Sequence, residues 1–534
     1  MIKKLFPPLL SVTGAALVLG LASFASRLIG IGRDRIFAHY FGAGDILDTY
    51  YAAFRIPDLV YNLIVVGALS SGFIPVFVEL SLRDKQKAWK ITSAIINILG
   101  LILVIICGLL WIFTPQIMPY LVPGFGAEKI AQTILLTRIM YLSPIILGIS
   151  GIVNGVIQAK RNFFIYSLTP ILYNLGIIIG TIFLFPIFGL AGLAYGVILG
   201  AVLHLLTQIP TLYQHGYHYR PILLWRDRDV HTIFRLTIPR ALSMGVSQIN
   251  LIVTTTLAST LALGSVAIFN LASNLQAFPV SIIGISFAVA VFPILTESFA
   301  EKHLDNLAAQ ISATIRQVLF FISPLTIIFL LLRAQIVRVV LGSGEFDWQD
   351  TITTADTLAF FTLSLFAQCL IHLLARGFYA IRDTKTPFYI AIIAAIVNIS
   401  SAIYLKNILG VPGLALAFTI SAIFQMAMLW FMLRLKIHTL NESLILSSLL
   451  KISLASLLMA AIVQFLKTPL ASLVDMTKFW GIFSQGAVAG LTGLLAYFLI
   501  LHWLRLDELQ QLIASFRRRF LRITGLEPEA NKVN

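Results

Sequence analysis

The sequence predicts an all-α polytopic membrane protein with about fourteen transmembrane helices. Of its 534 residues, 58% are hydrophobic and only 11% are charged, a composition that a soluble globular protein of this size does not need. Apolar runs of about 20 residues, the length that crosses a bilayer, recur along the chain. The formal net charge of +15 arises from lysines and arginines in loops between these runs, which indicates membrane topology rather than a nucleic-acid partner.

The apolar runs define the predicted spans. Met1-Ile-Lys-Lys followed by an apolar run imitates a signal peptide, but no convincing small-residue cleavage site follows, so the first run is interpreted as an uncleaved helix. The predicted spans are 10–32, 50–77, 91–113, 132–158, 165–186, 188–212, 234–260, 264–295, 312–333, 355–381, 387–406, 411–434, 449–468 and 479–503.

The loops after even-numbered spans carry the positive charge. The opposite loops, at 185–189 and 259–264, are nearly bare. Because cytoplasmic loops are enriched in lysine and arginine, and because Lys3 and Lys4 precede the first span, both termini are predicted to be cytoplasmic. The charged loop residues are Arg83, Lys85, Lys87, Lys90, Lys160, Arg161, Arg220, Arg226, Arg228, Arg235, Arg382 and Lys385.

An internal repeat divides the chain. Four segments recur in the same order at offsets of 218 to 222 residues, and six spans separate the copies, so the copies have the same membrane orientation. This predicts two six-helix lobes related by a parallel repeat, plus two extra C-terminal helices. The paired segments are 54–57 with 276–279, 75–79 with 293–297, 155–162 with 377–383, and 189–194 with 410–415.

The repeat and the spans together predict four regions. These are an N-lobe at 1–215, a C-lobe at 216–440, spans thirteen and fourteen at 441–504, and a tail at 505–534. In the tail, apolar residues recur at helical spacing among arginines, which is typical of a basic amphipathic helix lying on anionic headgroups. The apolar residues are Leu509, Leu512, Ile513, Phe516 and Phe520, and the arginines are Arg517, Arg518, Arg519 and Arg522.

Charged residues interrupt the first two spans. Arg27, Arg33 and Asp34 lie in or beside the first, and Asp48 and Arg55 open the second. A charge near the bilayer centre costs roughly 2.5 kcal/mol or more, so such residues normally face a bundle interior or a water-filled cavity. This pattern predicts a polar cargo. The alternative interpretation, a solvated loop cluster, applies most to Arg35 and Asp45 and least to the deeper Arg27.

Other chemistry is not indicated. The sequence has no Walker loop, no metal-binding cluster and no nucleophile motif, so we expect no enzyme activity, no cofactor and no metal. Cys107 and Cys369 lie in distant apolar spans and are interpreted as small buried hydrophobic residues. Energy must then come from an ion gradient or the membrane potential, and we favour the potential because spans seven and eleven offer no carboxylate for a sodium site.

Several motifs resemble the MurJ (MviN) family of lipid II flippases, in the MOP exporter superfamily, over essentially the whole chain. They are Arg27-Leu-Ile-Gly-Ile-Gly-Arg-Asp34, Phe41-Gly-Ala-Gly44 followed by Asp48, Ala53-Phe-Arg-Ile-Pro57, Gly67-Ala-Leu-Ser-Ser-Gly-Phe-Ile-Pro-Val-Phe77, Ser247-Gln-Ile-Asn250, Gly342-Ser-Gly-Glu-Phe-Asp347 and Gly377-Phe-Tyr-Ala-Ile-Arg-Asp-Thr-Lys-Thr-Pro387.

The resemblance implies a V-shaped two-lobed bundle in the bacterial cytoplasmic membrane that moves a lipid-linked disaccharide-pentapeptide outward by alternating access. It implies that Arg27, Arg33 and Arg55 face the cavity and bind the pyrophosphate of the cargo, and guanidinium groups suit phosphate oxygens. Asp34 and Asp48 would orient these arginines or form ion pairs that change as the lobes rock. It also implies that the last two spans form a groove for the polyprenyl tail, although two purely structural helices are an alternative.

The chain departs from the family pattern at two places. Tyr61 and Val66 stand where many members have a basic and then an acidic residue, and Asn274 stands where many have an arginine. Arg240, which follows Pro239, is a candidate to supply the missing charge, or else a snorkelling residue near the cytoplasmic end. Asn274 and Arg240 therefore join the candidate substrate-binding residues.

Other cargoes remain alternatives. The chain could export another lipid-linked oligosaccharide or a drug-like cation, but surplus arginine in the first span argues against a cation. A membrane scaffold would explain the repeat but not the costly charges. The expected partners are lipid II and membrane lipids, with cell-wall synthases left open.

Overall fold

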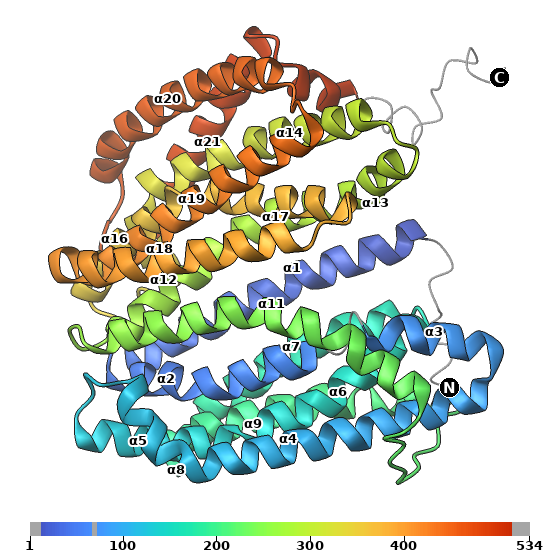
Figure 1. Ribbon diagram of the computed structural model, residues 1–534. Helices are drawn as coiled ribbons and strands as arrows, with labels where there is room; N and C mark the ends of the chain where they lie inside the picture. Colours follow the sequence, from blue (N-terminus) through green and yellow to red (C-terminus); the bar gives the residue numbers. More distant parts are fainter. Residues whose placement is uncertain (1–11, 67–71, 515–534) are drawn as a thin grey trace. The chain divides into compact units, whose positions relative to one another are not determined.

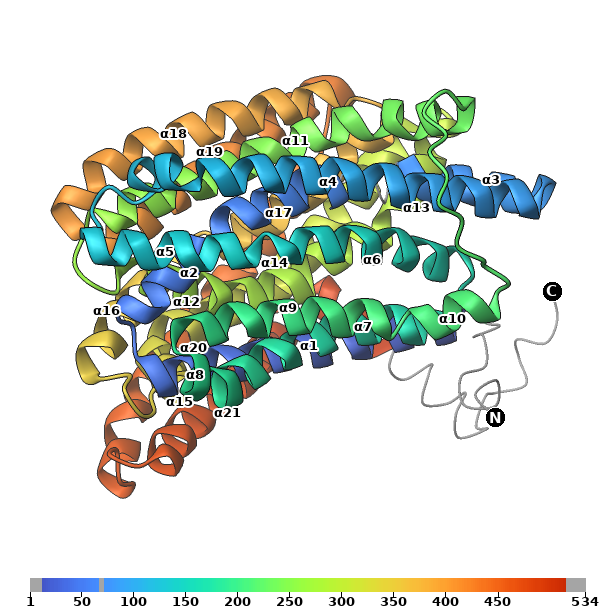
Figure 2. The same ribbon diagram turned by 90° about the horizontal axis from the view of Figure 1, so that it is seen from below.

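The computed structural model describes residues 12–66 and 72–514, and all regular secondary structure in these ranges is helical (Figures 1 and 2). The elements are α1 (Val12–Phe41), α2 (Asp45–Val60), the π-helix η2 (Tyr61–Val66), α3 (Ile74–Arg83), α4 (Lys85–Leu121), α5 (Ala127–Met140), α6 (Leu142–Ala159), α7 (Phe163–Ile179), the π-helix η4 (Gly180–Leu184), α8 (Phe185–Phe188), α9 (Leu190–Leu206), α10 (Ile209–Gln214), α11 (Arg228–Ser259), α12 (Ser265–Pro279), the π-helix η5 (Val280–Ile285), α13 (Ser286–Ala300), α14 (Leu304–Leu331), α15 (Arg333–Val340), α16 (Trp348–Thr362), α17 (Leu365–Ala380), α18 (Lys385–Leu409), α19 (Val411–Ile437), α20 (Glu442–Leu473) and α21 (Phe479–Trp503).

Membrane-spanning length and composition match the predicted fold class. Within the described residues, ten helical segments are long and apolar enough to cross a membrane, or eleven if the bent pair α16 and α17 forms one span. The three further predicted spans, 10–32, 50–77 and 234–260, each include residues whose backbone or side chains lie outside the described part. The all-helical, multi-pass class is confirmed, and the count of fourteen stays a prediction.

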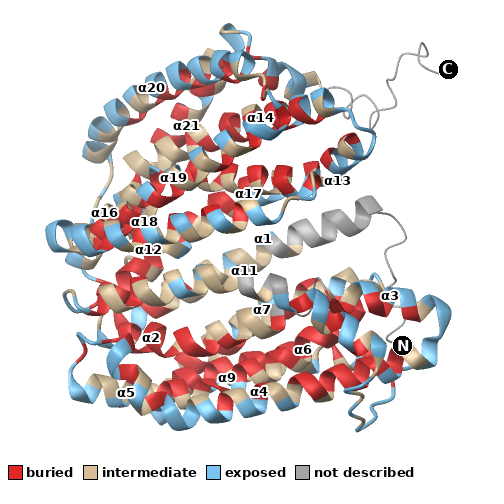
Figure 3. Ribbon diagram, in the orientation of Figure 1, coloured by how far each residue is buried: buried red, intermediate tan, exposed pale blue. Residues whose placement is uncertain are grey.

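The helices pack into two compact units. Unit 1 comprises Met1–Leu275, Val340–Thr357 and Ala391–Phe418, and unit 2 comprises Gln276–Val339, Leu358–Ile390 and Thr419–Asn534. In unit 1, buried residues concentrate on α2 and α6 (Figure 3). In unit 2, α13, α14, α17, α19, α20 and α21 share one apolar core. The four predicted regions, with boundaries after 215, 440 and 504, stay a prediction.

Glycines allow a close contact between two helices in unit 1. Gly176 and Gly180 face Gly196 and Gly200 on α9, and a Cβ added at Gly176 would lie 2.2 Å from the Cα of Gly200. A Cβ at Gly180 would lie 2.3 Å from the Cα of Gly196. Glycines four residues apart let two membrane helices approach backbone to backbone, where van der Waals packing stabilises the pair. Any larger residue at these positions would separate α7 from α9.

The sequence repeat recurs in the local backbone. Arg161 and Arg382, each two residues beyond the end of α6 or α17, both adopt the left-handed conformation, with φ of 57° and 62°. Gly189 and Gly410 do the same before α9 and α19, with φ of 57° and 62°. The hydrogen bonds around each turn also match in pattern: the amide of Arg161 donates to Gln158 and that of Arg382 to Tyr379. These turns repeat at an offset of 221 residues. Three of the four sequence matches have the same offset to within one residue.

The two additional C-terminal helices belong to unit 2. The hydroxyl of Tyr497 on α21 donates to the carbonyl of Phe320 on α14 at 2.8 Å. Beyond α21, Glu508 is only 5% exposed and accepts a 2.6 Å hydrogen bond from Arg316 on α14. The start of the predicted tail is therefore packed into the bundle. Phe516, Phe520 and the tail arginines lie outside the described residues.

Candidate functional site

Arg33 and Asp34 form an ion pair on α1. Nε and Nη2 of Arg33 donate to Oδ1 of Asp34 at 3.0 and 2.7 Å, and Nη1 donates to the amide oxygen of Asn174 on α7 at 3.1 Å. The guanidinium also lies 5.8 Å from the centre of the Phe37 ring. The Arg33 side chain is 21% exposed and that of Asp34 only 7%. A partly accessible guanidinium that is oriented in this way can donate its hydrogen bonds to an anion in place of one of its present partners.

Asp34 has a second partner on another helix. Its Oδ2 accepts a 2.9 Å hydrogen bond from Nδ2 of Asn274 on α12. The structure therefore brings together three of the residues singled out in the sequence: Arg33, Asp34 and Asn274. The residue that departs from the family pattern participates in the network, and it contributes an amide rather than a charge.

Arg55 is buried on α2 with neutral hydrogen-bond partners. Its Nε donates to Oγ1 of Thr255 on α11 at 2.7 Å, and Nη2 donates to Oδ1 of Asn270 on α12 at 2.5 Å. Arg55 is 8% exposed. The sequence did not single out Thr255 or Asn270. Neutral polar residues in apolar spans are common, so the only available signal was their concentration in α11 and α12.

Asp48 has a different environment. It is 2% exposed, and its carboxylate accepts the backbone N–H groups of Gly264 and Ala267 at 2.9 Å each. It also forms an ion pair with Nζ of Lys129 on α5 at 2.9 Å. These amides belong to the beginning of α12, where unpaired N–H groups favour a negative charge. The carboxylate therefore ties α2 to the beginning of α12.

The turn between α1 and α2 is packed tightly against two loops. The amide of Glu345 donates to the carbonyl of His39 at 3.0 Å, and the amide of Ala43 donates to Asp350 at 2.9 Å. Gly264 has a φ of 79°, and a Cβ there would lie 1.7 Å from the carbonyl oxygen of Ala43. Such a position accepts only glycine. With the Asp48 contacts, these interactions close this end of unit 1, which the charge pattern predicts to be the non-cytoplasmic end.

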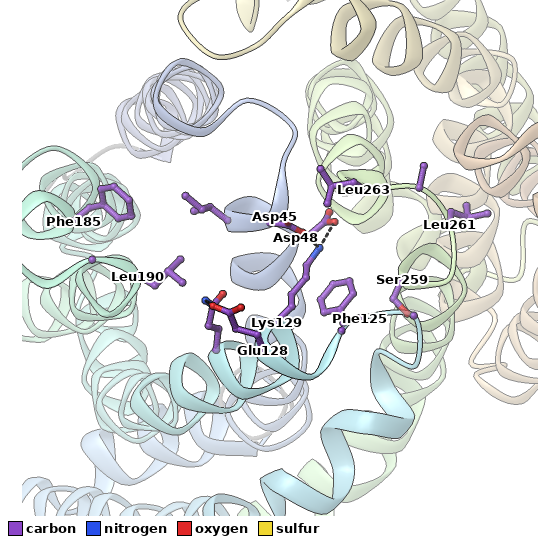
Figure 4. A pocket seen from close by; sticks show the side chains of 16 residues that line it. Asp45, Asp48, Phe125, Glu128, Lys129, Phe185, Leu190, Ser259, Leu261 and Leu263 are labelled. Carbon is purple, nitrogen blue, oxygen red and sulfur yellow. Dashed lines mark hydrogen bonds and ion pairs between the residues drawn. The ribbon is translucent and has the colours of Figure 1, made fainter.

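A pocket of about 770 Å³, lined by both charged and apolar side chains, lies at the closed end. Figure 4 shows Lys129 reaching from α5 toward Asp45 and Asp48, with the ring of Phe125 beside it. The ammonium nitrogen lies 2.5 Å from Asp45 and 4.0 Å from the centre of the Phe125 ring. Lys129, which the sequence did not single out, therefore links the two acidic residues of α2 to α5.

Arg27 and Arg240 are the remaining candidate residues. Arg27 is partly exposed and lies seven residues before Asp34, which places both residues on the same face of α1. The Arg240 side chain lies outside the described residues, although its backbone is part of α11. Among the described side chains, no group of three histidine, cysteine, aspartate or glutamate residues could hold a metal ion.

Comparison with solved structures identifies the fold. The structure titled "Lipid II flippase MurJ, inward closed conformation" aligns with a TM-score of 0.77 and 26% identity over 92% of this chain and 99% of that one. An inward-facing multidrug resistance MATE family transporter of the MOP superfamily aligns with a TM-score of 0.66 over 78% of this chain and 96% of that one, at 18% identity, and so shares the fold. The match at 26% identity to the MurJ structure indicates a multi-pass membrane transporter, not an enzyme.

Sequence comparison then gives the family. The family model "Lipid II flippase MurJ" matches residues 37–483, and the chain belongs to the MurJ family. A probable lipid II flippase MurJ of Thermotoga maritima is 28% identical over 93% of this chain and 98% of its own length. Its counterpart in Haemophilus influenzae is 30% identical over 74% of this chain and 81% of its own length. The family predicted from the sequence motifs is confirmed.

Proposed function

We propose that this protein flips lipid II from the cytoplasmic to the outer face of the bacterial cytoplasmic membrane by alternating access, with both termini in the cytoplasm. The family match over residues 37–483 supports the cargo. The observation that carries the site assignment is the network of Arg33, Asp34 and Asn274, which places an oriented guanidinium among helices that cross the membrane.

The hydrogen-bond partners of the arginines suit an anionic head group. Arg55 donates to a hydroxyl and an amide, so a phosphate oxygen can replace them without breaking a hydrogen-bonded ion pair. Arg33 is already paired with Asp34, but Asn274 also holds that carboxylate. Asp34 can therefore keep one partner while Arg33 turns toward a pyrophosphate. Arg27 on the same face of α1 completes the proposed head-group site, and Arg240 is its candidate member from α11.

The closed end is the proposed outer gate. Release of cargo to the outside requires Asp48 to leave the amides of Gly264 and Ala267, whereas its ion pair with Lys129 lies within the first half and can stay intact. Each of these contacts is individually modest, and hydrogen bonds to a charged group are worth roughly 1.5–3 kcal/mol. A carboxylate with several such partners holds the gate closed yet allows it to reopen. This gives Asp48 a gating role, distinct from contact with the pyrophosphate.

Membrane potential is the proposed energy source. The cavity cations of the site move relative to the field as the protein reorients, and each charge that crosses contributes about 2.3 kcal/mol per 100 mV. The net charge that the empty site moves through the field would therefore bias the return of the empty carrier. Spans thirteen and fourteen, which correspond to α20 and α21, are proposed to hold the polyprenyl tail.

Another lipid-linked oligosaccharide is the second candidate cargo. The observation that favours it is Asn274, because the amide removes a cation that the family pattern places in span eight. A cargo with a single phosphate, or with a different sugar, would need one less guanidinium. A drug-like cation fits less well, since Arg33 and Arg55 would repel it.

Complementation tests both the cargo and the site. Bacteria depleted of their own lipid II flippase would receive the native chain, Arg27→Ala, Arg33→Ala or the control Arg83→Ala, whose side chain is 76% exposed and paired with Glu79. We expect growth with the native chain and the control, and none with the two site variants at equal abundance. Rescue by all four proteins would refute the arginine site. No rescue by a correctly inserted native chain would favour the second cargo.

A further inference from the structure

An apolar groove lies on unit 1, away from the charged residues of α1 and α2. It has a volume of about 460 Å³ and is bordered by α4, α6, α9, α10 and the segment that follows α10. Its lining includes Gly100 and Val104 on α4, Ile149 and Val153 on α6, and Leu205 on α9. Val104 is 52% exposed, so the groove opens onto the surface that faces lipid. Neither α1, α2 nor α12 contributes to it, which separates it from the proposed cargo site.

A polar strap closes one end of the groove. Nδ2 of Asn97 on α4 donates to the carbonyls of Arg220 and Ile222 at 2.9 Å each, and its Oδ1 accepts from the hydroxyl of Tyr219 at 2.8 Å. The hydroxyls of Ser93 and Tyr217 are 3.0 Å apart. These bonds hold the segment after α10 across α4. Figure 2 shows this segment running from α10 past α4 to α11.

Tyrosines mark this end as the membrane interface. Tyr213, Tyr217 and Tyr219 all line the groove, and Tyr213 and Tyr219 are about half exposed, at 54% and 53%. Tyrosine is enriched at the level of lipid headgroups, where its ring is apolar and its hydroxyl is hydrated. The remainder of the groove, from Gly100 toward Val104, runs along α4 into the apolar layer.

Cationic residues gather at the same end. A Cβ added at Gly216 would lie 4.0 Å from Nζ of Lys85, so this ammonium lies at the strap. Nζ of Lys160 lies 6.0 Å from the centre of the Trp89 ring, and that ring packs edge-on against Tyr217 at 5.5 Å. The amide of Arg220 donates to Ser93 at 3.3 Å, which fixes its backbone beside the groove.

The acidic residues near the groove already have hydrogen-bond or ion-pair partners. Asp229 pairs with Lys87 at 2.5 Å, and Asp84 caps the start of α4 by accepting the amide of Lys87. The pKa of His215, on the strap, is lowered by burial and by the positive charges of Lys160 and Lys85. The end of the groove is thus a positively charged site for a headgroup, next to an apolar channel for a chain.

We propose that this groove binds an anionic phospholipid of the surrounding membrane, with one acyl chain along Gly100 and Val104 and the phosphate at Lys85, Lys160 and Arg220. Basic pockets between transmembrane helices favour anionic headgroups, and an apolar cavity is satisfied by a hydrocarbon chain rather than by water. The bound lipid would hold α4, α6 and α10 together on the cytoplasmic side. The inference goes beyond the proposed function and is independent of the cargo.

Native mass spectrometry of the full-length protein in detergent tests the channel. Dioleoyl phosphatidylglycerol and dioleoyl phosphatidylcholine would each be added to the native chain and to Gly100→Phe. A Cβ at Gly100 meets nothing within 4 Å, so the larger side chain fills the groove without disturbing the core. Gly108→Phe is the matched control, because Gly108 lies on the same helix, also has no neighbour within 4 Å, and does not line the groove.

Four results are expected. The native chain retains one phosphatidylglycerol more tightly than phosphatidylcholine. Gly100→Phe weakens retention of the lipid about tenfold, because about two methylenes of the acyl chain lose their place in the groove. Gly108→Phe retains the lipid as the native chain does. Arg220→Gln lowers the preference for the anionic lipid by about fivefold. Equal retention by the Gly100→Phe and Gly108→Phe proteins would overturn the groove. Equal retention of both lipids by the native chain would overturn the assigned headgroup chemistry.

Discussion

The two halves of the repeat treat charge differently in unit 1. In the first half, α1 and α2 carry Arg33, Asp34, Asp48 and Arg55. In the second half, α11 and α12 provide neutral side chains or backbone amides as hydrogen-bond partners. Thr255 and Asn270 accept from Arg55, and Asn274 donates to Asp34. The first amides of α12 donate to Asp48. One half therefore holds the charges, and the other supplies partners that can be exchanged.

This asymmetry suits a carrier. Opposed full charges across two halves would form buried ion pairs, and breaking such a pair costs roughly 3–5 kcal/mol. Hydrogen bonds between a charged and a neutral group are weaker, at roughly 1.5–3 kcal/mol, so they can be replaced by contacts to a cargo. The difference between the halves shows how the protein can keep the charge that binds its cargo without a buried ion pair between the halves that would hold it in one conformation. The following changes test this, from the largest expected effect to the smallest.

Removing a charge from the first half has the largest expected effect. Arg55→Ala eliminates a buried guanidinium that we place at the pyrophosphate, so transport of labelled lipid II in proteoliposomes is expected to fall by about a hundredfold. Arg55→Lys keeps the charge but loses the forked geometry, and about tenfold slower transport is expected. Arg83→Ala serves as the control. Native rates in Arg55→Ala would remove Arg55 from the site.

Loosening the junction at Asp48 comes next. Asp48→Asn keeps the size of the side chain but weakens its bonds to Gly264, Ala267 and Lys129, so the closed end is expected to open more often. The measurement is labelling of a cysteine at Ala43, which is only 5% exposed at this junction, by an impermeant maleimide added outside, in a chain with Cys107 and Cys369 replaced. We expect about tenfold faster labelling than with Asp48 intact. Unchanged labelling would mean that Asp48 does not control the gate.

Changing a neutral partner in the second half has a smaller expected effect. Asn274→Ala removes one hydrogen bond to Asp34, and transport is expected to slow by about fivefold because roughly 1 kcal/mol of orientation is lost. Asn274→Arg restores the cation of the family pattern and forms an ion pair with Asp34. If opposed charges lock the protein, this variant binds its cargo more tightly but moves it more slowly. Faster transport in Asn274→Arg would contradict the asymmetry argument.

The smallest expected effect is on stability. It concerns the loop after α17, where the second half of the repeat has a charged residue. Asp383, aligned by the turn geometry with Asn162, accepts hydrogen bonds from Lys436 and Thr386. Burial raises the pKa of Asp383, but these donors outweigh burial and lower it to about 2. Since the unfolded value is about 3.9, the stabilisation is complete above about pH 4 and is lost as the pH falls toward 2.

Thermal unfolding in detergent between pH 2 and 6 would measure this contribution. Asp383→Asn is expected to lower the midpoint slightly at pH 6 and to have no effect near pH 2. The change is small because the Lys436 side chain is 43% exposed and the pair is screened by water. An equal loss at both pH values would show that the effect does not come from the ionised carboxylate.

Much of the fold was predictable from hydropathy and repeats alone. The helical class, the multi-pass topology and the position of the α6 and α17 turns follow from local patterns, because a transmembrane helix must satisfy its own backbone in lipid. The repeat was detectable in part because the turns before α9 and α19 need a positive φ, which favours glycine at both Gly189 and Gly410. Arg33, Asp34, Asp48 and Arg55 stood out because a charge in an apolar run is expensive.

Partners and closures were decided only by the tertiary structure. Nothing in the chain around Asp48 indicates that its carboxylate binds the first amides of α12, since backbone donors carry no sequence signature. Thr255, Asn270 and Lys129 were missed because polar residues in or near spans cost little and are common. The groove at Gly100 depends on the packing of four helices and a strap. The sequence by itself therefore determined which residues carry charge and which segments cross the membrane, whereas packing across distant helices decided what each charge contacts.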